Sequence, residues 1–556
     1  MLPIAMWGAE DWIVALATAV LAFFLAGGLV IAASSKPEVM GHPKGLYMLF
    51  FAEMWERFSF YGMRAILVFY LVQHWLFAET DAQGVVGAYG ALVYITPVLG
   101  GYLADRYLGQ RKAVLFGGVL LAIGHGLMAV EGRGGTDDAT INIFWGALAF
   151  IIVGSGFLKA NISVMVGQLY SRTDVRRDGA YTIFYMGINA GAAIGTLLVG
   201  YLGQKVGWGY GFGLAGIGML SGLVVFVLGR KTLKGGGEPV RPLSRQTEWM
   251  LYAVGVASIA VIWVLIQNRD IIQMLLLVSG IALLGYVLFQ AFKLDKVPRE
   301  RIFAILFLIS LNPIFWALFE QAGGSINLYT DKFADTKIPA SLFQAINPTY
   351  IILLAPLFAA LWVSLAKRGL EPSAPAKFGL ALLQVGASLV VFVLGANAFG
   401  VETQMPDGSI VYLTPIIWVF ILYLLATTGE LCLSPVGLSA MNRLAPSFMA
   451  SLIMGAWFYM TAVGNFLAGV IGEQTGGHSG EMEQARTLEV WSFIGWIAVG
   501  VGVVVLLLSP IVKRWMHLDK LKDEDELAGY KEMGGDRGQD AGMFPNRETK
   551  PEPGQL

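Results

Sequence analysis

About fifteen apolar runs, each long enough to cross a lipid bilayer, follow one another along this chain of 556 residues. The chain is 56% hydrophobic and 14% charged, whereas soluble domains carry about 25% charged residues. The runs begin near Trp12, Tyr47, Gly84, Ala113, Asn142, Ala180, Tyr210, Trp249, Ile271, Ile302, Ala340, Phe378, Leu413, Ala450 and Val490. The sequence therefore predicts an all-α polytopic membrane protein embedded in a lipid bilayer.

The charge and the reactive residues argue against several function classes. A net charge of -1 gives no reason to expect a nucleic-acid partner. The single Cys432 excludes an internal disulfide and a cysteine-based metal cluster, and no two of the five histidines stand at metal-ligand spacing. A membrane peptidase or acyltransferase needs a nucleophile with a positioned base, or a metal, and the corresponding motifs are missing from the sequence. We therefore expect neither an enzyme nor a cofactor, and no obligate protein partner is evident.

Lys and Arg residues gather in alternate loops between the apolar runs. One side holds about 25 of them and the other about six, which predicts that the richer side and the C-terminus are cytoplasmic. The first run, near Trp12 to Ala33, begins at Glu10 and Asp11 and lacks the basic n-region of a signal peptide. If this run spans the membrane, the N-terminus lies outside. The poorer side consists of Arg133, Lys205, Arg269, Lys332, Lys337 and Arg486.

The order of the runs predicts five parts. Six plus six spans are typical of transporters built from two similar halves, whose substrate site lies between the halves near the midplane. The polar last part is rich in Gly, Asp, Glu and Lys, and we expect it to be a disordered cytoplasmic tail. The parts are an extra N-terminal helix and linker (1–44), a six-helix bundle (45–235), two inserted helices (236–299), a second six-helix bundle (300–517) and the tail (518–556).

One apolar run carries four ionisable side chains, Glu53, Glu56, Arg57 and Arg64. A charge at the bilayer centre costs roughly 2.5–3.5 kcal/mol on insertion scales, and such groups usually face a water-filled path. At about 100° per residue, these four and the aromatic pair Phe60-Tyr61 fall within an arc of roughly 140°. The spacing predicts a helix that lines a polar cavity with one face.

Two more ionisable residues lie deep within apolar runs. Lys159 is too far from a helix end to snorkel, and Glu430 precedes Ser434 by one turn. Pro435 removes a backbone donor and predicts a kink or break of its helix, as is common near transporter substrate sites. We expect two further helices to line the cavity, with polar residues spaced four apart at Asn312, Trp316 and Glu320 and at Tyr181, Tyr185 and Asn189.

The buried acids outnumber the buried bases by one. The acids are Glu53, Glu56, Glu320 and Glu430, and the bases are Arg57, Arg64 and Lys159. A carboxylate without a partner in a low-dielectric environment tends to hold a proton. We therefore predict a proton-binding site, most naturally at Glu53 or Glu56, which lie one turn apart.

Six motifs, spread in order over both halves of the chain, carry a family resemblance. They are Glu53-x-x-Glu56-Arg57-Phe58-x-x-Tyr61-Gly62, the loop Gly100–Lys112, Phe184-Tyr185-x-x-Ile188-Asn189-x-Gly191, Phe315-Trp316-x-x-Phe319-Glu320-Gln321, Phe343-Gln344-x-x-Asn347-Pro348 and Gly429-Glu430-x-x-x-Ser434-Pro435. Together they resemble the proton-coupled oligopeptide transporter (POT) family of the major facilitator superfamily. The two inserted runs look like those of bacterial members of that family.

The resemblance implies a symporter of the bacterial plasma membrane that imports di- and tripeptides with protons by alternating access. It implies the major facilitator fold, with the proton as the coupling ion. It assigns proton coupling to Glu53, Glu56 and Arg57. The residues that it implies for the peptide site are Tyr61, Arg64, Tyr94, Lys159, Tyr185, Asn189, Trp316, Asn347, Glu430, Ser434 and Trp457.

Charge complementarity agrees with a zwitterionic peptide, whose carboxylate needs a cationic contact and whose amine needs an anionic one. Arg64 and Lys159 stand in the first half, whereas Glu430 and Asn347 stand in the second. A peptide that bridges these charges would help to draw the halves together. We also predict that Arg64 with Glu320, and Lys159 with Glu430, form exchanging salt bridges that gate the two sides.

The chain departs from the family pattern in two ways. The family motif often has two tyrosines where this chain has Phe60-Tyr61, and no histidine stands beside the motif residues, which favours a glutamate-based proton path.

Two other functions remain open. Carriers of nitrate and other anions share the fold, but they would be expected to weaken the Glu-x-x-Glu-Arg group or the Glu430 contact, and both are intact. A nutrient sensor that does not transport could keep the binding residues, although the intact proton-coupling group argues against it.

Overall fold

The computed structural model describes residues 8–34, 36–170, 174, 176–233, 235–239, 243–404, 408, 410–446 and 449–520. Fourteen helices in these ranges are long and apolar enough to cross a membrane. Helix α2 (Lys44–Gln73) is a further membrane-length helix of 30 residues, and it carries Glu53, Glu56 and Arg57. The predicted all-α fold with about fifteen spans is confirmed. Beyond residue 520, the predicted tail lies outside the described residues.

Six helices between residues 44 and 233 pack chiefly on one another and form the N-bundle. Glycines of α6 let its backbone lie close to α2, because a Cβ added to Gly191 would stand 2.1 Å from the carbonyl oxygen of Met54. Besides α2, the N-bundle contains α3 (Glu79–Leu103), α4 (Gln110–Met128), α5 (Ile141–Gln168), α6 (Arg177–Tyr201) and α7 (Trp208–Gly229), with π-helical turns at Ala104–Leu108 and Leu202–Val206 and a 3-10 turn at Arg230–Leu233.

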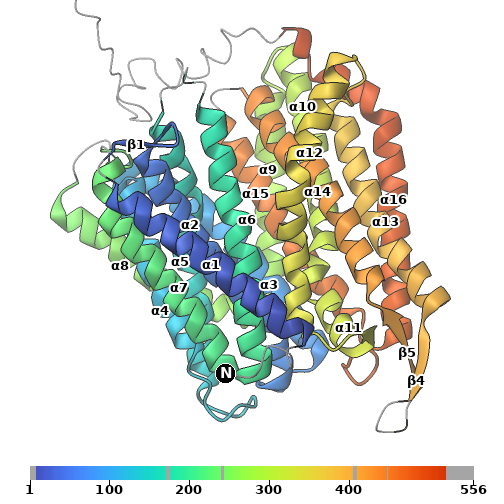
Figure 1. The fold of residues 1–556 in the computed structure, drawn as a ribbon. Helices are drawn as coiled ribbons and strands as arrows, with labels where there is room; N and C mark the ends of the chain where they lie inside the picture. Colours follow the sequence, from blue (N-terminus) through green and yellow to red (C-terminus); the bar gives the residue numbers. More distant parts are fainter. Residues whose placement is uncertain are drawn as a thin grey trace, which may run out of the picture.

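The helices after residue 296 form the C-bundle, which lies beside the N-bundle with α6 and α12 at the boundary (Figure 1). Of the kink or break predicted at Pro435, the break is wrong, because α14 continues through this residue without interruption. The C-bundle contains α10 (Lys296–Phe319), α11 (Ser325–Phe333), α12 (Ile346–Lys367), α13 (Ala374–Phe399), α14 (Ile417–Leu444), α15 (Ala450–Glu473) and α16 (Gln484–Trp515), with 3-10 turns at Glu320–Gly323, Ala340–Ala345 and Leu518–Lys520.

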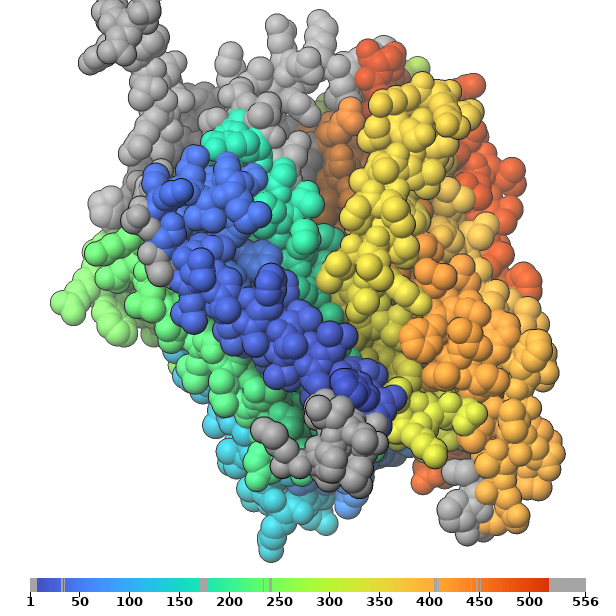
Figure 2. Space-filling view, in the orientation of Figure 1, coloured from blue at the N-terminus to red at the C-terminus, as the bar shows by residue number. Residues whose placement is uncertain are grey.

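Three helices lie outside the two bundles. The inserted pair consists of α8 (Arg245–Ile266), which packs on α5, and α9 (Arg269–Ala291), which contacts α3, α10 and α15. Helix α1 (Ala9–Ala33) crosses the outside of the N-bundle obliquely and packs on α2 and α6 (Figures 1 and 2). Near its start, Glu10 Oε2 lies 3.6 Å from Lys205 Nζ.

The few strands are short. β1 (Glu38–Val39) pairs with β2 (His42–Pro43), and β4 (Val401–Gln404) forms an antiparallel hairpin with β5 (Ile410–Pro415), to which β3 (Ala334–Asp335) adds in parallel. The β4–β5 hairpin and α11 lie at the same end of the molecule as the start of α1 (Figure 1). We call this end, which carries Lys205 and Lys332, the outer end, and the opposite one the basic end.

Candidate functional site

Helix α2 places two carboxylates around one guanidinium. Nε and Nη2 of Arg57 each lie 2.7 Å from Glu53 Oε1, and Nε lies 3.1 Å from Glu56 Oε2. Both glutamates are fully buried. Neither oxygen of Glu56 accepts a hydrogen bond from a described residue. The two carboxylates therefore share one cation, and Glu56 is the less firmly held of the two.

Lys159 reaches this region from α5 but pairs with no acid. Among the described residues, no carboxylate oxygen lies within 4 Å of its buried Nζ, and Nζ donates no hydrogen bond. The ammonium instead lies 4.0 Å from the ring centroid of Phe60 and 4.7 Å from that of Tyr94. These are cation–π distances. Lys159 is thus a buried cation that two aromatic rings contact.

The outer end joins the two bundles through ion pairs and hydrogen bonds. Arg64 of α2 forms an ion pair with Glu320, which follows α10. Lys332 Nζ lies 2.7 Å from Glu79 Oε1 of α3. Gln204 Oε1 also accepts hydrogen bonds from the backbone N–H and the hydroxyl of Ser341, at 3.1 and 2.6 Å. The predicted Arg64–Glu320 pair is therefore present, and the outer end is closed.

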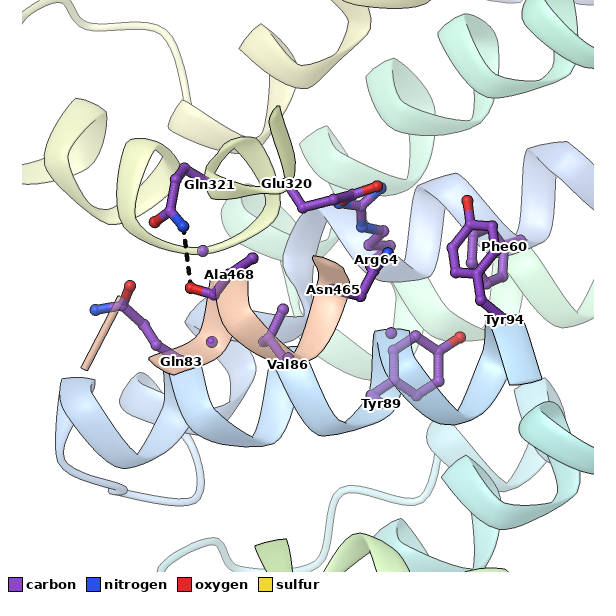
Figure 3. Close-up of a pocket in the computed structure, with 14 residues that line it drawn as sticks. Phe60, Arg64, Gln83, Val86, Tyr89, Tyr94, Glu320, Gln321, Asn465 and Ala468 are labelled. Atoms are coloured by element: carbon purple, nitrogen blue, oxygen red, sulfur yellow. Dashed lines mark hydrogen bonds and ion pairs between the residues drawn. The ribbon is translucent and has the colours of Figure 1, made fainter. Parts of the chain in front are cut away.

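A pocket lies beside the Arg64–Glu320 pair, between α3 and α15 (Figure 3). At one end of it, Gln321 Nε2 donates a hydrogen bond to the carbonyl oxygen of Ala468 at 3.0 Å. At the other end, the rings of Phe60 and Tyr94 lie next to each other (Figure 3). The pocket is lined by Phe60, Arg64, Gln83, Val86, Gly87, Tyr89, Gly90, Tyr94, Glu320, Gln321, Gly324, Asn465, Ala468 and Gly469.

In the C-bundle, Glu430 of α14 is held by a neutral group. Asn347 Nδ2 donates a hydrogen bond to Glu430 Oε2 at 3.0 Å and another to Thr427 Oγ1 at 3.0 Å. No Lys, Arg or His nitrogen of the described residues lies within 4 Å of the Glu430 carboxylate. The predicted Lys159–Glu430 salt bridge is therefore not formed in this conformation. The Ser434 hydroxyl, one turn further along α14, is buried and has no hydrogen-bond partner among the described residues.

The remaining predicted residues divide into exposed and packed groups. Tyr185 is 40% exposed, and its carbonyl oxygen accepts a hydrogen bond from Asn189 Nδ2 at 3.0 Å. Trp457 is buried, whereas Trp316 packs edge-on against its neighbours in α10. Asn312 does not line a cavity as predicted, because its Nδ2 donates to the Trp457 carbonyl and to a threonine of α15.

The sequence reasoning missed several residues of this region. Phe60 belongs to the arc that was predicted to line a polar cavity, but the contact of its ring with the Lys159 ammonium was not predicted. Gln83 and Asn465 line the pocket, and Lys332 was counted only as a loop cation. A glutamine and an asparagine within apolar runs were the available signal, but the pairing of α3 with α15 could not be derived from spacing.

The two bundles, the ionisable residues between them and the closed outer end define a membrane transporter of the major facilitator type. A sequence model of the POT family matches residues 111–488, and the chain belongs to this family.

Relatives resemble this chain over nearly their whole length. The "Uncharacterized transporter YclF" of Bacillus subtilis is 36% identical over 496 residues, which is 86% of this chain and 95% of the relative. The "Peptide transporter YePEPT" of Yersinia enterocolitica is 36% identical over 501 residues, covering 85% and 95%. The "Di-/tripeptide transporter" of Lactococcus lactis is 32% identical over 504 residues, covering 85% and 96%. The crystal structure of a "peptide transporter POT in complex with sulfate" superposes with a TM-score of 0.75 at 35% identity, covering 88% of this chain and 99% of that one.

Proposed function

We propose that the protein is a proton-coupled symporter that imports di- and tripeptides by alternating access. One observation carries the proposal: Lys159 Nζ in the N-bundle is buried, Glu430 in the C-bundle is half-buried, and neither has an opposite charge within 4 Å among the described residues. A buried charge is costly unless it is paired. A zwitterionic peptide supplies the carboxylate for Lys159 and the amine for Glu430. The names of the Yersinia and Lactococcus relatives support this substrate class.

Proton coupling falls to Glu53, Glu56 and Arg57 in this proposal. Two carboxylates that share one guanidinium leave the group with a net charge of -1, so binding one proton makes it neutral. The weaker hold on Glu56 makes it the proton acceptor. The peptide-lining residues are those that the resemblance implies: Tyr61, Arg64, Tyr94, Lys159, Tyr185, Asn189, Trp316, Asn347, Glu430, Ser434 and Trp457.

Alternating access requires the two ends to open in turn. The Arg64–Glu320 pair closes the outer end here, and a Lys159–Glu430 pair would form when the basic end closes. The proposal places the basic end in the cytoplasm, the start of α1 outside and the protein in the plasma membrane. The bundles then correspond to residues 45–235 and 300–517, with 236–299 as inserted helices.

The test is uptake of a labelled dipeptide into proteoliposomes with an imposed pH gradient. Accumulation should depend on the gradient, unlabelled dipeptide should compete and nitrate should not. Recovery of intact peptide from the vesicles would separate transport from hydrolysis. Uptake that is the same at every pH gradient would rule out proton coupling, and competition by nitrate alone would favour an anion carrier.

A further inference from the structure

Lys159 needs a source of stabilisation other than an acid, and the structure assigns that role to two rings. We propose that Phe60 and Tyr94 form an aromatic cradle that holds Lys159 unpaired for the carboxylate of an incoming peptide. Phe60 is then a positioning residue, and the inference rests on the proposed function. A ring face attracts an ammonium group electrostatically, and it does not neutralise the charge, so the ammonium can still donate hydrogen bonds to a carboxylate.

Three of the four intramembrane acids are already engaged, which favours the contact of Lys159 with the rings. Glu53 is bonded to Arg57, and Glu320 is paired with Arg64. Glu430 is held by a neutral amide on the other bundle. Glu56, whose oxygens accept no hydrogen bond from a described residue, is the acid most able to capture the ammonium. The cradle therefore keeps Lys159 available to the substrate and keeps Glu56 available to a proton.

The Phe60 ring is well fixed for this role. Its side chain is 2% exposed. The ring stacks on Tyr89 at a centroid distance of 6.3 Å and meets Tyr61 edge-on at 5.2 Å. Because phenylalanine has no hydroxyl, its contact with Lys159 at 4.0 Å is made through the ring alone. The same ring lines the outer pocket, as Arg64 and Glu320 do (Figure 3).

The experiment compares two competitors of labelled dipeptide binding, Ala-Ala and Ala-Ala amide, which differ only in the terminal carboxylate. The purified wild-type protein should prefer Ala-Ala. Phe60→Leu keeps an apolar side chain but removes the ring, and it should lower this preference about 2- to 30-fold, the range of one cation–π contact. The affinity for the amide should stay the same. Phe60→Tyr keeps the ring and should retain the wild-type preference.

Other outcomes would overturn the inference. If Phe60→Leu weakens both competitors equally, the ring only supports packing, and an unchanged preference would mean that it does not act on Lys159. If Phe60→Leu does not give a monodisperse protein, the pair Tyr94→Leu and Tyr94→Phe decides, since only the first removes a ring. A wild-type protein that binds neither competitor would refute the proposed function instead, so the two failures are distinguishable.

Discussion

The two bundles differ in what their intramembrane charges contact. The N-bundle contains both signs: two carboxylates share Arg57, and Lys159 rests on aromatic rings. In the C-bundle, the amide of Asn347 is the only hydrogen-bond partner of the Glu430 side chain among the described residues. Neither bundle neutralises its own intramembrane charges, so charges of one bundle must be balanced by charges of the other. At the outer end this happens through the protein itself, in the Arg64–Glu320 pair. Deeper in the molecule, neither Lys159 nor Glu430 has an opposite charge within 4 Å among the described residues.

The strongest test of this comparison removes the charge of Glu320, which pairs with Arg64 of the other bundle. In Glu320→Gln, Arg64 remains buried without its acid, which should destabilise the closed outer end by about 3–5 kcal/mol. The readout is labelling of Ala468→Cys, a position in the outer pocket, by an impermeant maleimide in a Cys432→Ser background. Labelling should rise sharply. The double variant Arg64→Gln/Glu320→Gln should restore much of the protection, because the two changes are coupled, and purely additive effects would contradict the pairing.

Removing either unmatched charge should weaken peptide binding about 10- to 150-fold, the range for one hydrogen bond to a charged group. Lys159→Gln should abolish the preference for a free carboxylate over a terminal amide. Glu430→Gln should abolish the preference for a free amine over an N-acetyl group. Competition binding with the two blocked dipeptides checks both. Glu489→Gln, whose side chain is 70% exposed, is the matched control, and the comparison fails if each variant loses both preferences equally.

The sequence predicted well where the helices lie and which charged residues stand within them, because both follow from hydropathy and spacing. It also predicted the Arg64–Glu320 partnership through the family motifs. The environment of Lys159 could not be predicted, since it depends on how α2, α3 and α5 pack together. Pro435 illustrates the converse: the residue predicted a kink or break, yet α14 runs unbroken through it. Transmembrane helices tolerate proline where neighbouring groups satisfy the freed carbonyl.

Replacing Glu53 and replacing Glu56 should have different effects. A gradient of one pH unit supports about tenfold accumulation per coupled proton. Glu56→Gln should abolish this accumulation while leaving exchange of labelled for unlabelled peptide, which needs no net proton movement. Glu53→Gln removes the close partner of Arg57 and should also lower the thermal stability of the purified protein, since it leaves a buried cation poorly paired. Equal accumulation in Glu56→Gln and the wild type would show that the proton binds elsewhere.

The smallest effect should come from the neutral contact at the same outer end. Gln204 Oε1 accepts two hydrogen bonds from Ser341 of the C-bundle, and a hydrogen bond between neutral groups contributes about 0.5–1.5 kcal/mol net. Gln204→Ala should therefore increase labelling of the Ala468→Cys reporter only modestly, far less than Glu320→Gln. Gln267→Ala, at an exposed glutamine that follows α8, is the control and should not change it. If Gln204→Ala opened the outer end as much as Glu320→Gln, closure would depend on the packing of α6 against the C-bundle, and the Arg64–Glu320 charge pair would be a minor contributor.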